Sequence, residues 1–151
     1  MKLLSVLFGA SVFALIGTKI FQGDWNFLLS GNIAMAVFII FTGVSHFKFQ
    51  KGMAMMIPEL FPAKMFLVYF TGFLEIAAGI GLLIPSLREI TAILLIIFFV
   101  CILPANYKAS KENLNIYKAD FTGPGMDYFW KQRLPMQIIL IAWTFYFGIY
   151  L

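Results

Sequence analysis

The chain has 151 residues, of which 62% are hydrophobic and 12% are charged. A soluble domain is usually about 45–50% apolar and about 25% charged, so this composition excludes a disordered chain, a collagen-like chain and an ordinary soluble enzyme. The apolar runs are continuous rather than alternating, which disfavours an outer-membrane barrel. The composition therefore predicts an all-α integral membrane protein.

Five apolar segments are long enough to cross a hydrocarbon core about 30 Å thick as helices. In chain order they cover residues 3–21, 28–47, 64–84, 88–106 and 134–150. The first segment resembles a signal peptide in that Lys2 precedes an apolar stretch, but no small-x-small cleavage site follows it, so we expect it to be retained. Short connections at 22–27 and around 85–88 favour antiparallel neighbours in one bundle. We expect one transmembrane domain over residues 1–151.

Basic residues are distributed unevenly over the loops that these spans define. Nine lie on the side of the N-terminus and of loops 48–63 and 107–133, against two on the other side. The nine are Lys2, Lys48, Lys51, Lys64, Lys108, Lys111, Lys118, Lys131 and Arg133, and the two are Lys19 and Arg88. By the positive-inside rule we expect a multi-pass protein of the cytoplasmic (inner or plasma) membrane, with the N-terminus cytoplasmic and the C-terminus outside. Topology and lipid head groups then account for the net charge of +4, and we expect no nucleic-acid partner.

Two of the loops carry their own patterns. Residues 49–63 mix Met, Phe and Pro and are expected to lie at the membrane interface, and residues 111–118 read as a short surface helix. The single cysteine, Cys101, excludes a self-contained dithiol oxidoreductase, because it cannot form an intramolecular disulfide or a CxxC pair. Its apolar neighbours predict a buried small hydrophobe.

Glu75 is the most informative residue, because it lies near the middle of the third apolar segment. An acidic side chain at that depth costs roughly 2.5–3.5 kcal/mol on insertion scales, so it should face the inside of the bundle. Gly72 and Gly79 share its helix face and would let another helix approach closely. Two roles stay open: a structural hydrogen bond from a protonated Glu75, or a ligand contact or proton carrier.

Four further polar residues are expected in the cytoplasmic half of the bundle: His46, Asn106, Arg133 and Gln137. His46 is the only histidine, either bonded to a carbonyl at the interface or paired with Glu75. One histidine and one nearby acid are too few for a metal site, and we expect none. Arg133 alone is often a topology anchor, but Gln137 follows it by four residues, so both can point to one face. Together with Glu75 these residues predict a ligand-binding pocket that opens toward the cytoplasmic leaflet.

The order and spacing of several short motifs resemble the DoxX-like family of small integral membrane proteins. The motifs are FTGVSHF (41–47), IPELFPA (57–63), YFTGFLEIAAGIGLLIP (69–85), ILPANYKAS (102–110) and RLPMQIILIAW (133–143). The resemblance implies a four-helix transmembrane bundle core, to which this chain adds an N-terminal transmembrane helix. Carried over by position, the matching polar residues are His46, Glu75, Asn106, Arg133 and Gln137.

The resemblance also bears on activity, since family members of the DoxX and DoxD type are associated with thiosulfate:quinone oxidoreductase, as its small subunit, and with membrane redox complexes. It therefore implies a bound, non-covalent quinone or another apolar or lipidic small molecule. The main alternative is a non-enzymatic subunit that assembles with or anchors a partner protein through loops 49–63 and 107–133. A transporter is a third reading, although five short helices with one acid make a small frame for alternating access. The sequence does not decide whether the protein is an enzyme.

Overall fold

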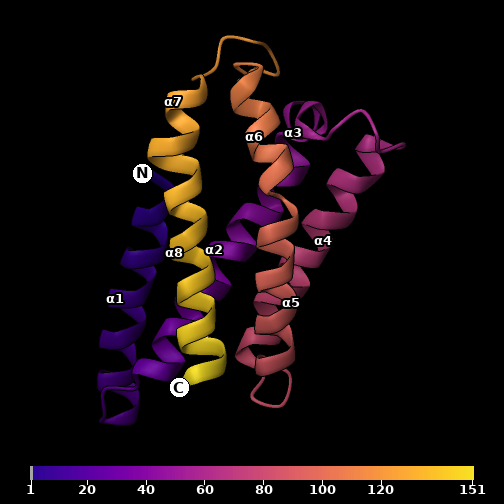
Figure 1. The fold of residues 1–151 in the computed structure, drawn as a ribbon. Helices are drawn as coiled ribbons and strands as arrows, with labels where there is room; N and C mark the ends of the chain where they lie inside the picture. The colour runs from indigo at the N-terminus through magenta and orange to yellow at the C-terminus, as the bar shows by residue number, and fades with distance from the viewer. Residues whose placement is uncertain (1) are drawn as a thin grey trace.

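The computed structural model describes residues 2–151, apart from the side chain of Lys2, and is helical along most of this length (Figure 1). The α-helices are α1 (Lys2–Gln22), α2 (Phe27–Lys48), α3 (Gln50–Met56), α4 (Lys64–Leu83), α5 (Arg88–Cys101), α6 (Leu103–Lys111), α7 (Met126–Tyr128) and α8 (Leu134–Phe145). Two π-helical turns flank α8, namely η1 (Phe129–Arg133) and η2 (Tyr146–Tyr150). Within the described residues the nearest approach to a sheet is an isolated bridge between Asn115 and Asp120.

Four helical stretches are long and apolar enough to cross a membrane, at Leu3–Gln22, Phe27–Lys48, Lys64–Leu83 and Arg88–Lys111. The prediction of an all-helical chain with apolar helices of spanning length is therefore confirmed for these four. The fifth predicted span, 134–150, is helical as α8 continued by η2, and α8 itself has 12 residues. Its crossing of a membrane stays a prediction.

The fourth helical stretch continues further than its sequence predicts. A break at Ile102 separates α5 from α6, and the helix then runs on to Lys111 instead of ending near Asn106. Pro104 lies in the first turn of α6, where a backbone N–H has no helical acceptor, so proline starts this helix rather than ending it.

The surface helix predicted over residues 111–118 is wrong. After α6 ends, Asn113 adopts a left-handed backbone with φ of 52°, which asparagine tolerates better than most residues, and the chain turns. Asn115 and Asp120 then pair through their backbones, with the Asn115 N–H donating to the Asp120 carbonyl at 2.7 Å. The polar stretch is thus a packed turn, which its charge pattern did not reveal.

Helix α2 lies at the centre of the packing, between α1 on one side and α4 on the other. The face of α4 that carries Glu75 meets α2 through small residues, as predicted. A Cβ at Gly72 would lie 2.8 Å from the Cβ of His46, and a Cβ at Gly79 would lie 2.5 Å from a side-chain carbon of Ile40. The two backbones therefore approach as closely as glycine allows.

The C-terminal helix packs against α5, and a polar side chain fastens its end to α2. Asn32 Nδ2 donates to the carbonyl of Phe147 at 2.7 Å, inside η2. This is the bond between helices that an asparagine in an apolar segment can supply. The turn η1 ends two residues before Pro135, and the N–H of Leu134, the first residue of α8, bonds to the Phe129 carbonyl, five residues back. A proline that cannot donate a backbone hydrogen bond is a common neighbour of such distortions.

The elements divide between two ends of the bundle (Figure 1). Helix α3 and the long α6–α7 connection lie at one end, while the α1–α2 and α4–α5 turns and the C-terminus lie at the other. The loops expected on the cytoplasmic side, 48–63 and 107–133, therefore share one end of the molecule. Lys2, which was counted on that side, has its side chain outside the described part of the structure.

Candidate functional site

A partly open cavity of about 580 Å³ lies among α2, α4, α5, α6 and the start of α8, close to α3. Its volume falls within the roughly 300–1,000 Å³ typical of small-molecule sites. Its walls are mainly apolar, with side chains such as Phe38, Ile39, Phe99, Met136 and Leu140. All five residues predicted to form a site line it: His46, Glu75, Asn106, Arg133 and Gln137. Five positions on five elements, namely α2, α4, α6, η1 and α8, are thus brought to one cavity.

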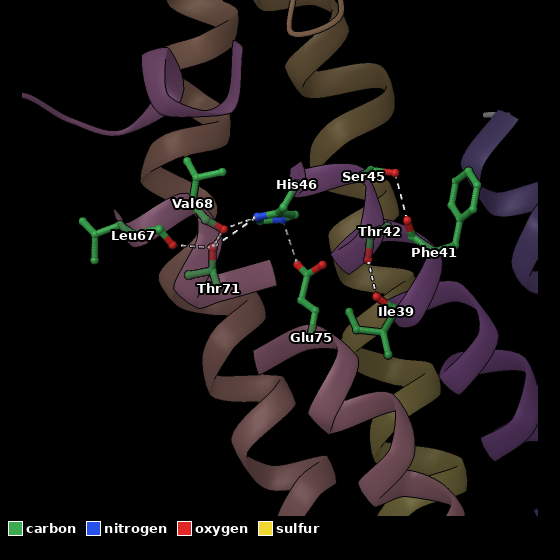
Figure 2. Close-up of polar contacts among 9 residues, drawn as sticks. All are labelled: Ile39, Phe41, Thr42, Ser45, His46, Leu67, Val68, Thr71 and Glu75. Atoms are coloured by element: carbon green, nitrogen blue, oxygen red, sulfur yellow. Dashed lines mark hydrogen bonds and ion pairs between the residues drawn. The ribbon is translucent and has the colours of Figure 1, made fainter. Parts of the chain in front are cut away.

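The deeper polar contact of the cavity joins His46 of α2 to Glu75 of α4 (Figure 2). His46 Nε2 lies 3.5 Å from Glu75 Oε1, and the two side chains are 15% and 7% exposed. On the other edge of the ring, Nδ1 lies 2.9 Å from the carbonyl oxygen of Val68 and 3.2 Å from the hydroxyl of Thr71. Both alternatives weighed for His46, a carbonyl bond and a pairing with Glu75, are therefore present together.

The carbonyl of Val68 determines where the imidazole protons lie. A carbonyl oxygen only accepts hydrogen bonds, so Nδ1 carries a proton and donates it to Val68. In the neutral ring Nε2 is then an acceptor, and a hydrogen bond across the 3.5 Å contact with Glu75 forms when one of the two atoms carries a proton. Such a bond joins either neutral His46 to protonated Glu75 or a His46 cation to a Glu75 carboxylate. Both arrangements have no net charge.

The second oxygen of Glu75 has no hydrogen-bond partner although it is buried. The nearby hydroxyls of α2 are engaged elsewhere, since Thr42 donates to the carbonyl of Ile39 at 2.9 Å and Ser45 donates to that of Phe41 at 2.8 Å (Figure 2). A buried polar oxygen without a partner costs about 1–3 kcal/mol. Its presence in a cavity-lining side chain marks a position that a ligand donor can satisfy.

A second polar group of the cavity joins α6 to η1. Arg133 Nη1 donates to Asn106 Oδ1 at 2.8 Å, and the guanidinium carbon lies 5.6 Å from the centre of the Tyr128 ring. The Nε of Arg133 is buried without an acceptor. Arg133 is therefore built into the cavity wall, and its role as a topology anchor stays a prediction.

Gln137 also lines the cavity, but its amide is used in the frame. Its Nε2 donates to the carbonyl of Phe99 at 2.7 Å, between α8 and α5, and the side chain is 2% exposed. Phe99 lies in the last turn of α5, beside the break that precedes Pro104. The glutamine therefore holds two helices at the depth of the site and supplies an oxygen as its remaining polar atom.

Sequence reasoning missed two residues of this site. Thr71 precedes Glu75 by one helical turn and contacts His46, and the spacing of four residues was the available signal. Cys101 lines the cavity and is exposed, so the expectation of a buried thiol is wrong. The break at Ile102 places it at the end of α5, outside the packed core.

Within residues 2–151 there is no group of three or more His, Cys, Asp and Glu side chains that could hold a metal ion. The polar groups of the cavity include instead the His46–Glu75 pair, the guanidinium of Arg133, two amides and several hydroxyls in a mainly apolar wall. Such an arrangement can bind a molecule with one polar part and one apolar part, and can exchange a proton with an oxygen of that molecule.

Comparison with known proteins places the chain in a family. A family model described as Domain of unknown function (DUF8561) matches residues 35–147, so the chain belongs to this family. The match begins within α2 and includes all five predicted site residues. A search of curated proteins and a search of solved structures gave no significant match.

Proposed function

We propose that this member of the DUF8561 family is a multi-pass membrane protein of five spans that binds a quinone-like or lipidic molecule in the cavity around Glu75 and His46. The observation that carries the proposal is the buried, unpartnered Oε2 of Glu75 in the wall of a 580 Å³ cavity that is otherwise mainly apolar. If Glu75 had only a structural role, both of its carboxyl oxygens would be expected to have hydrogen-bond partners within the bundle.

The outward faces of the long helices support the membrane location. Large apolar side chains are exposed along them, among them Phe13 (79%), Phe73 (64%), Leu94 (59%) and Ile138 (59%). A soluble monomer rarely exposes apolar patches of more than a few hundred Å², whereas a bilayer covers such faces at no cost. The predicted orientation, with the α3 end cytoplasmic, places the His46 end of the cavity in the cytoplasmic half.

The resemblance to DoxX-like proteins supports a redox-linked process. In this chain His46 and Glu75, 3.5 Å apart, give the cavity two neighbouring groups that can pass a proton to or from a ligand oxygen. That property suits a quinone, whose oxygens exchange protons when it is reduced or oxidised, and it also suits a lipid with a hydroxyl or acidic head.

The test is to purify the protein from native membranes in neutral detergent, together with Glu75→Gln, and to analyse both by native mass spectrometry and by extraction into organic solvent. We expect a near-stoichiometric quinone or lipid in the wild type and at most one tenth of that occupancy in Glu75→Gln. Glu89→Gln is the matched control, because Glu89 is exposed at the start of α5 and outside the cavity.

Full ligand occupancy in Glu75→Gln would refute the role of Glu75. An empty wild-type cavity with a stoichiometric partner protein, lost when the 107–133 loop is altered, would replace the proposal by the assembly or anchoring role. Circular dichroism and gel filtration of each variant establish that the bundle is intact before occupancy is compared.

A further inference from the structure

We infer that the cavity selects an anionic amphiphile, with a carboxylate or phosphate head held by Arg133 and Asn106 and a single apolar chain among the walls of α2, α5 and α8. This inference rests on the proposed function and specifies the chemistry of the ligand. Its basis is Arg133, whose guanidinium forms no ion pair with an acidic side chain of the described residues.

Among the described residues that line the cavity, His46, Glu75 and Arg133 are the ones of the Asp, Glu, His, Lys and Arg types. His46 and Glu75 face each other across a 3.5 Å contact, so each of them is the other's partner. Arg133 adds one positive charge, because a guanidinium is always protonated in proteins. Among the described lining residues, Arg133 is thus the one permanent cation, and the His46–Glu75 contact does not involve it.

No acidic side chain of residues 2–151 neutralises Arg133. Its nearest oriented partners are a neutral amide oxygen on Asn106, at 2.8 Å, and the face of the Tyr128 ring. No carboxylate of the described chain forms an ion pair with it within 4.0 Å. A partly buried cation without a counter-ion is unfavourable, since charges removed from water are normally paired.

The geometry of the guanidinium also favours an anion. Nη1 is occupied by Asn106, whereas Nε is enclosed in the protein without an acceptor. Carboxylates and phosphates bind arginine side-on through Nε and the neighbouring Nη2, with two parallel hydrogen bonds. The amide of Asn106 fixes the guanidinium and provides an NH₂ group beside it as a further donor.

The rest of the cavity determines what the anion is attached to. Apolar side chains from α2, α5 and α8 continue from the Arg133 region toward Leu140, and among the side chains that the structure describes no other lysine or arginine lines these walls. A volume of about 580 Å³ is that of a small-molecule site, so one chain fits this description better than the two chains of a bilayer phospholipid. The Glu75–His46 pair then lies along the chain or beside a polar group on it.

The experiment is a competition read by native mass spectrometry in neutral-detergent micelles. Equimolar palmitate, hexadecyl phosphate, hexadecanol and decyl-ubiquinone are offered to the wild type, and inorganic phosphate is offered alone. We expect at least tenfold preference for palmitate or hexadecyl phosphate over hexadecanol, which has the same chain without the charge. Comparison of the two anions shows which head is preferred, and binding of inorganic phosphate alone at equal strength would refute the role of the apolar chain.

Variants connect the preference to the residue. Arg133→Gln is expected to remove the preference for the anions, and Arg133→Lys is expected to retain part of it, since the charge remains but the side-on geometry does not. Arg88→Gln is the matched control, because Arg88 lies at the start of α5, outside the cavity, and donates to the carbonyl of Leu82. It should leave the preference unchanged.

The outcomes separate this inference from the proposed function. Equal binding of hexadecanol, decyl-ubiquinone and the anions to the wild type, or a preference that survives in Arg133→Gln, overturns the inference while the cavity remains a ligand site. Failure of all four amphiphiles to bind the wild type overturns both. The comparison of palmitate with hexadecanol is made on the wild type, so it holds even if a variant does not fold.

Discussion

Replacing Gly72 with alanine should separate α2 from α4 and disturb the His46–Glu75 pair in one step. The added Cβ would lie 2.8 Å from the Cβ of His46, 3.1 Å from the carbonyl oxygen of Gly43 and 3.2 Å from the Cγ of His46. Neither the backbone of Gly43 nor the first carbon of His46 can move without its helix. The clash must therefore be relieved by displacement of one helix.

The size of the effect follows from these distances. Carbon atoms in favourable contact lie about 3.5–4.0 Å apart, so the helices must separate by about 0.7 Å at this point. A gap of about 0.5–1 Å forfeits a quarter to a half of the dispersion energy of each contact that opens. Overpacked cores lose about 1–3 kcal/mol, while alanine in a helix gains about 0.5–1 kcal/mol over glycine. We expect a net loss of about 1–2 kcal/mol in the free energy of unfolding.

The assay is unfolding in mixed micelles of dodecyl maltoside and sodium dodecyl sulfate, followed by the circular dichroism of the helices. Gly9→Ala is the matched control, because a Cβ at Gly9 of α1 has no atom within 4 Å. It should be neutral or slightly stabilising by the helix-propensity gain. In the Gly72→Ala background, Glu75→Gln should cost less than in the wild type, because the shifted His46 has already weakened the pair. A Gly72→Ala protein that unfolds at the same or higher detergent fraction than Gly9→Ala would refute the tight crossing.

Two further predictions concern the end of the bundle that carries α3. Lys108→Met removes donors to the carbonyls of Met55 and Ile57, at 3.2 and 3.0 Å, and to Glu59 Oε1, at 3.2 Å. It should lower the free energy of unfolding by about 1–3 kcal/mol. Lys111 is exposed, so Lys111→Met should change this free energy little. Equal effects of the two substitutions in thermal unfolding would contradict the capping of α3 by Lys108. Hydrogen bonds from Lys64 and Lys108 hold the pKa of Glu59 below its ordinary value of 4.5. The Glu59 carboxylate therefore stabilises the fold fully above pH 4.5, and this stabilisation is lost as the pH falls through the lowered pKa. Glu59→Gln should therefore flatten the decline of thermal stability between about pH 5 and pH 3, most clearly at low salt, and an unchanged decline would exclude this carboxylate as a cause.

The helices and the placement of Glu75 could be predicted from the sequence better than the structure of the loops. The grounds were the apolar pattern and the free-energy cost of placing a polar side chain in a membrane. Three helices begin and end within two residues of the expected spans, because length and apolar content are continuous along them. Glu75 was assigned to the bundle interior from its insertion cost, and it is 6% exposed against α2. The glycines around it correctly identified the face of close approach.

Distances between elements could not be predicted from the sequence, and neither could the exact ends of helices that contain proline. Pro104 reads as a stop in an apolar pattern, but a new helix, α6, begins at Leu103, and it packs against α3, α7 and η1, which are distant from it in the sequence. The contact of His46 with both Val68 and Glu75 depends on how α2 and α4 cross. The lack of a counter-ion for Arg133 becomes visible only when its neighbours are known.

The π-helical turn η1 makes the phase of the C-terminal helix depend on a single residue. A π turn holds one residue more than the α turn it replaces, so the side chains on either side of it are out of step with a regular helical repeat. Removal of one residue from Phe129–Gln132 would restore the regular repeat and rotate what precedes it by about 100° relative to Arg133 and α8. A relative with one residue fewer at this point would keep every motif. In place of Tyr128, however, another side chain would lie against Arg133. Members of such a family can therefore come to bind different ligands through a change in the number of residues at η1, and not only through substitutions.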